Sequence, residues 1–187
     1  MRKVIFFNAI TADGFFEGPN HEIDWHNVDD EFNELAIDQL DSVDVLLFGR
    51  LTYELMSGYW PTAEGLKDDP LVAEKMNSKA KIVFSRTLDQ VDWNNTRLVK
   101  ENISAEIAKL KSQPGKDLII FGSSDLSVTL TQKGLIDEYR LMVNPLFLGS
   151  GKTILHGLPG RLDLKFLKTH IMRNGNVILY YQPAGKD

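Results

Sequence analysis

Short apolar runs of strand length alternate with segments of helical period along most of the chain, and this alternation constrains the fold more than any other feature. A continuous apolar run of about four to eight residues indicates a buried strand. Such strands, when helices separate them, are typical of a parallel sheet that helices cover on both faces. The runs are residues 4–10, 43–48, 81–85 and 118–121, and the helical segments are residues 28–40, 51–56, 70–77, 103–110 and 126–130. We therefore predict an α/β fold with a mostly parallel central sheet.

The last third of the chain has a different pattern. Strand-like runs at residues 136–143, 164–171 and 177–182 follow one another without a clear helix between them. Asn174-Gly175 separates the last two runs and is a strong short-range signal for a β-hairpin. The sequence therefore predicts an antiparallel C-terminal hairpin at the edge of the sheet, and a single domain over residues 1–187.

Composition excludes several kinds of site. The 187 residues include no cysteine, which rules out disulfides, thiolate zinc sites and cysteine nucleophiles. The four histidines have no metal-ligand spacing, so we expect no metal site. The net charge of −5 lacks the basic footprint of a nucleic-acid-binding protein. No apolar stretch has the length of a membrane span, and the run at residues 4–10 is too short for a signal peptide, so we expect a cytoplasmic protein without nucleic-acid or membrane partners.

Small or cationic residues follow three of the predicted strands, and we expect each group to face a helix N-terminus. The three groups are Gly49-Arg50, Ser85-Arg86 and Gly122-Ser123-Ser124. Ligands bind open α/β sheets outside the carboxyl ends of the strands, where helix N-termini offer free N–H groups and arginine binds phosphate with two hydrogen bonds. Each group alone is better explained as an ordinary strand-to-helix turn, with Arg50 and Arg86 as solvated charges. Three groups along one sheet favour a ligand with several phosphates.

Gly149-Ser150-Gly151-Lys152-Thr153 is similar to the end of a phosphate-binding P-loop. Leu146 stands where the P-loop requires its first glycine, and no helix is predicted after Thr153. We therefore interpret this segment as a glycine turn between two strands.

Several of these motifs resemble those of the dihydrofolate reductase superfamily. The segments that carry the resemblance are Asn8–Gly14, Phe48–Glu54, Ser85–Leu88 and Phe121–Ser124. Within the superfamily, the chain is most similar to the reductase domain of riboflavin biosynthesis, the C-terminal domain of a bifunctional deaminase–reductase, through Thr11–Gly14, Leu135–Tyr139, Asn144-Pro145 and Leu148–Lys152. The resemblance implies a dihydrofolate reductase-like three-layer α/β/α fold, NADPH as the cofactor and a homodimer.

The resemblance also implies roles for individual residues. It places the backbone of Ala9 and Ile10 against the nicotinamide. It places Ser85 and Arg86 at the adenosine 2′-phosphate, where they would select NADPH over NADH by charge. The other cofactor-binding residues would contact the phosphates and the nicotinamide ribose, and they are Gly49, Arg50, Thr52, Gly122, Ser123 and Ser124.

On the substrate side, we predict two catalytic carboxylates and two aromatic contacts. Asp13 ends the first strand beside the expected nicotinamide, and Asp30 matches the spacing of the pterin-binding carboxylate in folate reductases. A carboxylate there would position or relay the proton that accompanies hydride transfer, although Asp30 is also explained as a favourable charge at a helix start. Trp25 belongs to the long polar segment 11–27, which we interpret as a functional lid, and Tyr53 either stacks on a planar heterocycle or packs in the core.

The function that these expectations describe is an NADPH-dependent reductase. It would transfer hydride to a C=N or C=O group of a small pyrimidine- or pterin-like substrate, most like 5-amino-6-(5-phosphoribosylamino)uracil reductase. The absence of cysteine excludes the zinc signature of the deaminase domain to which that enzyme is fused. Two alternatives stay open, a dihydrofolate reductase proper and a nucleotide-binding module without catalysis.

Overall fold

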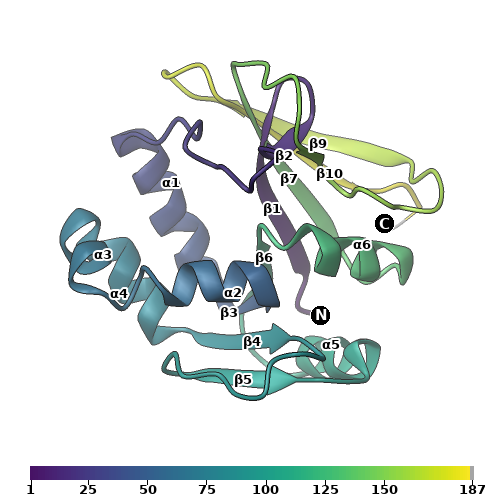
Figure 1. The fold of residues 1–187 in the computed structure, drawn as a ribbon. Helices are drawn as coiled ribbons and strands as arrows, with labels where there is room; N and C mark the ends of the chain where they lie inside the picture. Colours follow the sequence, from purple (N-terminus) through teal and green to yellow (C-terminus); the bar gives the residue numbers. More distant parts are fainter. Residues whose placement is uncertain (186–187) are drawn as a thin grey trace.

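The computed structural model describes residues 1–185, and a sheet of eight strands lies at its centre (Figure 1). Six neighbouring strands are parallel, and the last two are each antiparallel to the strand before. In order across the sheet they are β5 (Thr96–Val99), β4 (Ala80–Phe84), β3 (Val43–Gly49), β6 (Asp117–Phe121), β1 (Val4–Thr11), β7 (Glu138–Asn144), β10 (Val177–Pro183) and β9 (Leu164–Ile171). This arrangement confirms the predicted mostly parallel sheet with antiparallel C-terminal strands.

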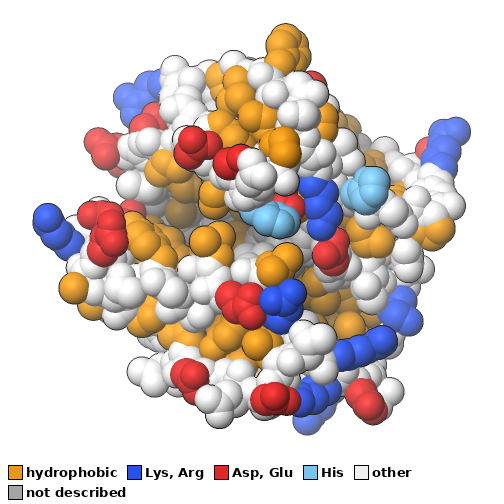
Figure 2. Space-filling view, in the orientation of Figure 1, with side chains coloured by type: hydrophobic (Ala, Val, Ile, Leu, Met, Phe, Trp, Pro, Cys, Tyr) orange, Lys and Arg blue, Asp and Glu red, His pale blue; other side chains and the backbone are white. Residues whose placement is uncertain are grey.

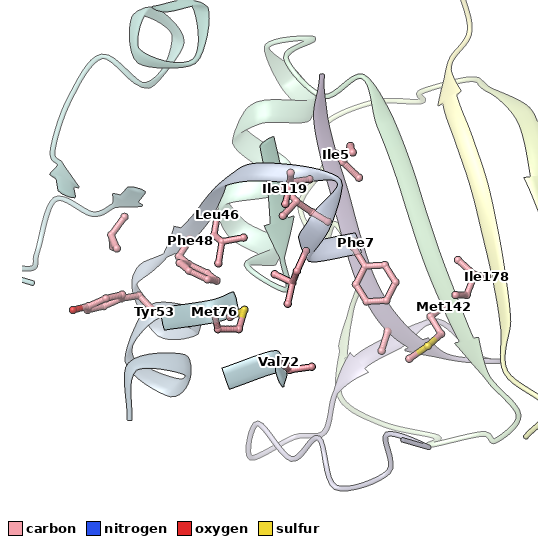
Figure 3. Close-up of a cluster of buried hydrophobic side chains, with 14 of the residues drawn as sticks. Ile5, Phe7, Leu46, Phe48, Tyr53, Val72, Met76, Ile119, Met142 and Ile178 are labelled. Carbon is pink, nitrogen blue, oxygen red and sulfur yellow. The ribbon is translucent and has the colours of Figure 1, made fainter. Parts of the chain in front are cut away.

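Helices cover both faces of the sheet. Successive side chains of a strand point to opposite faces, so each strand contributes to the core on both sides. On one face, side chains of α1 and α4 pack with Ile5 and Phe7 of β1, in the core that Figure 3 shows. On the other face, side chains of α5 and α6 pack with Val4 and Phe6. The helices are α1 (Asp30–Asp41), α2 (Arg50–Ser57), α3 (Ala63–Asp68), α4 (Pro70–Ser78), α5 (Ile103–Ser112) and α6 (Ser124–Gln132). Within residues 1–185, none of them is long and apolar enough to cross a membrane.

Side-chain caps determine where two of the predicted helices begin. The Asp69 carboxylate accepts the N–H of Val72 at 3.0 Å, and Pro70 occupies the first position of α4, as the sequence predicts. Helix α1 begins at Asp30 and not at the predicted residue 28. The reason is that the Asp29 carboxylate accepts the N–H of Phe32 at 2.9 Å and so caps the helix at that point.

The C-terminal hairpin confirms the prediction from Asn174-Gly175. The N–H of Gly175 donates to the carbonyl of Met172, and the N–H of Met172 donates to the carbonyl of Asn176. Gly175 has a φ of +90°, which glycine adopts without strain.

Three short elements are absent from the sequence prediction. Strand β2 (Phe15–Glu17) lies within the segment expected to be a loop, and it pairs with β8 (Lys152–Thr153) in a separate two-stranded sheet. Helix α3 follows the Tyr59–Pro61 segment. Elements of two to six residues are too short to show a period of their own.

Lys81 is a fully buried cation on β4. Its ammonium donates to the carbonyls of Met76, Asn77 and Lys79 at distances of 2.8–3.1 Å, and it lies 4.5 Å from the ring centroid of Trp93. Burial lowers the pKa of Lys81 to about 8, so the side chain is charged at neutral pH and ties the C-terminus of α4 to the sheet.

Candidate functional site

The C-terminal ends of four neighbouring parallel strands lie next to one another along one side of the sheet. In the order β4, β3, β6 and β1, the strands end at Phe84, Gly49, Phe121 and Thr11. The three groups of small and cationic residues therefore lie side by side, as the ligand hypothesis requires. One detail of the prediction is wrong, because no helix follows Ser85-Arg86 before β5. In the space-filling view, the surface is hollowed between α1 and these strand ends (Figure 2).

Two hydrogen bonds join the starts of α2 and α6. The N–H of Gly49 donates to the Ser123 Oγ at 3.0 Å, and the N–H of Ser123 donates to the Thr52 Oγ1 at 3.0 Å. Gly122 has a φ of +59°, and a Cβ on it would lie 3.4 Å from the Thr52 side chain. Thr52 and Ser123, both predicted cofactor ligands, thus also hold the two helix starts against each other.

The backbone N–H groups at these two helix starts have no side-chain cap. Helices α1, α3 and α4 are capped by an aspartate or threonine side chain, whereas α2, α5 and α6 are not. Ser124, the first residue of α6, is buried, and its Oγ has no hydrogen-bond partner within residues 1–185. Free N–H groups and the helix dipole make two adjacent uncapped starts a site for an anion.

Cations lie beside these strand ends. Arg50, the first residue of α2, forms an exposed ion pair with Glu54 at 3.0 Å. Arg86 is exposed, and no ion pair joins it to another side chain in the described part of the chain. The Ser85 Oγ accepts the N–H groups of Thr87 and Leu88 at 3.2 and 3.1 Å and thereby shapes the turn that carries Arg86. Ser85 and Arg86, which are predicted to bind the 2′-phosphate, therefore lie on an ordered turn, and the Arg86 guanidinium forms no ion pair within the described residues.

The predicted nicotinamide contacts lie at the end of β1. Ala9 and Ile10 are buried in this central strand, and the Ile10 carbonyl accepts the Asn144 amide at 3.3 Å. Their contact with a nicotinamide stays a prediction.

Asp13 connects two loops. Its carboxylate accepts the Thr11 hydroxyl and the N–H groups of Leu148 and Gly149, the latter at 2.8 Å. The Thr11 hydrogen bond, with the two backbone donors, lowers the pKa of Asp13 below its usual 3.8. These contacts are those of an anchor for the segment between β7 and β8. A catalytic role for Asp13 stays a prediction, and its lowered pKa makes it a poor proton donor at neutral pH.

Asp30 and Trp25 lie on the α1 side of the strand ends. Asp30 is exposed in the first turn of α1, as a charge that favours the helix start would be. Trp25 is half-buried against the core that contains Phe7. The centroids of its ring and the His26 ring lie 4.5 Å apart in an edge-on arrangement. Their substrate contacts stay predictions.

Tyr53 is a core residue in this structure. It belongs to the core cluster in Figure 3, its ring centroid lies 6.5 Å from that of Trp93, and its hydroxyl accepts the N–H groups of Asp92 and Trp93 at 3.0 and 3.3 Å. The alternative of core packing describes these contacts, and a substrate contact of Tyr53 stays a prediction.

An asparagine cluster that sequence reasoning does not identify borders the site. The Asn144 Oδ1 accepts the N–H of Asn27 at 3.0 Å, and the side chains of Asn174 and Asn176 donate to the Asn27 carbonyl. The cluster joins the segment before α1 to the ends of β1 and β7 and to the C-terminal hairpin. The only signal in the sequence is that three of these asparagines stand next to strand ends or turns.

Comparison with known proteins identifies the family. Residues 2–180 match the model of the RibD C-terminal domain. The chain is 36% identical over 184 residues to YyaP of Bacillus subtilis (strain 168), described as an uncharacterized protein, and the match covers 98% of this chain and 96% of YyaP.

Solved structures show the same fold. A putative riboflavin biosynthesis protein from Shewanella sp. PV-4 superposes with a TM-score of 0.74 at 23% identity, over 97% of this chain and 98% of that one. A deaminase/5-amino-6-(5-phosphoribosylamino)uracil reductase from Thermotoga maritima gives 0.69 at 12% identity, over 98% of this chain and 57% of that one. Dihydrofolate reductase from Enterococcus faecalis, complexed with NADP(H), gives 0.64 at 15% identity, over 97% and 96% of the two chains. The chain therefore belongs to the RibD C-terminal domain family and has the dihydrofolate reductase-like fold.

Proposed function

We propose that the protein is an NADPH-dependent reductase of a small pyrimidine-like metabolite. The observation that carries the proposal is the pair of adjacent uncapped helix starts, α2 and α6, which Gly49, Thr52 and Ser123 hold together at the strand ends. The buried Ser124 hydroxyl, which has no hydrogen-bond partner among the described residues, and the cations Arg50 and Arg86 add to the same anion site. These residues fit a cofactor with a pyrophosphate and a further phosphate.

When bound, NADPH supplies the hydride, and the protein supplies placement and charge. The helix starts and Arg50 would bind the pyrophosphate, and Arg86, on the turn shaped by Ser85, would bind the 2′-phosphate. The backbone at Ala9 and Ile10 would fix the nicotinamide plane beside the hollow next to α1. The similarity to a 5-amino-6-(5-phosphoribosylamino)uracil reductase supports a pyrimidine substrate over a pterin.

Binding of NADPH and NADH to arginine variants tests this function. We expect Arg86→Ala to weaken NADPH about tenfold or more and to leave NADH unchanged, because only NADPH carries the 2′-phosphate. Arg50→Ala should weaken both. Arg161→Ala, an exposed arginine paired with Asp163, is the matched control. The quenching of tryptophan fluorescence by each nucleotide measures the dissociation constants.

Turnover separates the candidate substrates. We expect NADPH oxidation with 5-amino-6-(5-phosphoribosylamino)uracil and little with dihydrofolate. Rapid turnover of dihydrofolate would favour a folate reductase, and tight NADPH binding without turnover of either compound would favour a binding module. Absence of NADPH binding to the wild-type protein would contradict the proposal itself.

A further inference from the structure

The glycine-rich segment between β7 and β8 contains none of the residues that the proposed function uses. It ends at Lys152, the first residue of β8. The Lys152 Nζ lies 2.8 Å from the Asp125 Oδ1, and Asp125 is the second residue of α6. A cation from a distant part of the chain therefore lies within the first turn of the uncapped helix.

The backbone around Lys152 is held in place on both sides. Gly151 has a φ of +141°, and a Cβ on it would lie 2.2 Å from the Glu17 carbonyl oxygen in β2. Asp13 binds the N–H groups of Leu148 and Gly149 on the preceding side. The Lys152 ammonium also lies 5.6 Å from the ring centroid of Phe16. The loop therefore presents this ammonium at one place, beside the start of α6.

The partner of Lys152 is easily exchanged. The Asp125 side chain is 73% exposed, and ion pairs of exposed side chains contribute little to stability. A carboxylate at an uncapped helix start also repels a second anion there, so Lys152 offsets that repulsion. At the start of α2, Arg50 likewise forms an ion pair with an exposed carboxylate, that of Glu54. Each of the two adjoining helix starts thus has one cation held by an exposed carboxylate.

We propose that Lys152 is a further cofactor-binding residue, whose ammonium exchanges Asp125 for the pyrophosphate at the start of α6. The inference rests on the proposed function, because it names a ligand contact of the same site. Lys152 and Arg50 then bind the pyrophosphate from two sides, and Arg86 binds the separate 2′-phosphate.

The binding of two nucleotides to Lys152 variants tests this assignment. We expect Lys152→Met to weaken NADPH about tenfold and Lys152→Arg to retain most of the affinity. Adenosine 2′-phosphate has no pyrophosphate, so its affinity should be unchanged in Lys152→Met and reduced in Arg86→Ala. Lys133→Met is the matched control, since Lys133 is an exposed lysine just past the opposite end of α6. Thermal unfolding shows whether each variant is folded.

Asp125→Asn distinguishes a ligand contact from a structural ion pair. If Lys152 leaves Asp125 for the pyrophosphate, Asp125→Asn should hold or increase the affinity for NADPH. An equal loss of affinity in Asp125→Asn and Lys152→Met would overturn the inference, as would unchanged NADPH binding in Lys152→Met. Failure of the wild-type protein to bind NADPH would instead contradict the proposed function, and the inference with it.

Discussion

At the scale of single residues, polar side chains at the strand ends hold backbone segments in place. The Thr52 and Ser123 hydroxyls accept backbone N–H groups from the neighbouring element, and the Asp13 carboxylate accepts two from the segment after β7. A ligand site built from loops needs such connections, because loops have little packing of their own. Residues that resemble ligand contacts can therefore act by shaping the backbone that makes the contact.

Asp13→Asn tests whether this carboxylate is an anchor. The hydrogen bonds that lower the pKa of Asp13 stabilise the folded chain above the ordinary pKa of 3.8, and this contribution is lost as the pH falls through the lower folded value. We expect the variant to be less stable than the wild-type protein at pH 7 and to approach it in stability as the pH falls below 3.8. Urea unfolding over this pH range measures the difference.

Asp24→Asn serves as the control, because Asp24 is an exposed carboxylate in the neighbouring segment. A variant with unchanged stability at every pH and a reduced turnover rate would show that Asp13 acts in catalysis and not as an anchor.

At the scale of elements, the small β2–β8 sheet positions the segment that carries Lys152. Gly151 makes this pairing possible, since its φ and its closeness to the Glu17 carbonyl leave no room for a side chain. Gly149, two residues earlier, also has a positive φ, but a Cβ there would meet open space. Comparing alanine substitutions at the two glycines therefore separates the effect of close packing from that of backbone strain.

We expect Gly151→Ala to lower the free energy of unfolding by about 2–3 kcal/mol, because the backbone of β2 or β8 must move. Gly149→Ala should lower it by only about 1 kcal/mol, the cost of a positive φ for alanine. Urea unfolding of the two variants measures both changes. Equal losses would mean that the β2–β8 contact contributes nothing of its own.

At the scale of the whole molecule, the sheet ends in an unprotected strand. All eight residues of β9 are exposed, and within residues 1–185 β9 has a strand partner only on its β10 side. Phe166 is 56% and Ile171 72% exposed. Exposed apolar side chains on an edge strand favour pairing with another chain. We propose that a second copy of this chain covers β9 and makes the homodimer that the family resemblance implies.

Light scattering after size exclusion tests the dimer. We expect a mass of twice 21.2 kDa for the wild-type protein and of one chain for the double variant Phe166→Asp/Ile171→Asp. Leu71→Asp changes an equally exposed leucine on α4 and should leave the dimer intact. A wild-type protein that migrates as a single chain would rule the proposal out.

The positions of the long elements follow from the sequence because they depend on local chemistry. The apolar run that starts β3, the Asp69-Pro70 start of α4 and the Asn174-Gly175 turn each act within a few residues. The glycines and arginines at the strand ends also indicate an anionic ligand before any tertiary contact is known. The same reasoning does not reach β2 and β8, which pair with each other from distant parts of the chain, or α3, whose six residues are too few to show a helical period.

The alternating α/β elements, the C-terminal hairpin and the preference of the strand ends for an anionic ligand can be predicted from local patterns of residues. The strand order β4-β3-β6-β1, which brings those ends together, and the partners of the polar residues there emerge only in the folded chain. Tyr53 became a core residue, Thr52 a link between helices and Lys152 a neighbour of α6 through contacts with residues 27 to 71 positions away. The physical reason is that secondary structure depends on neighbouring residues, whereas a site depends on long-range packing that no local pattern records.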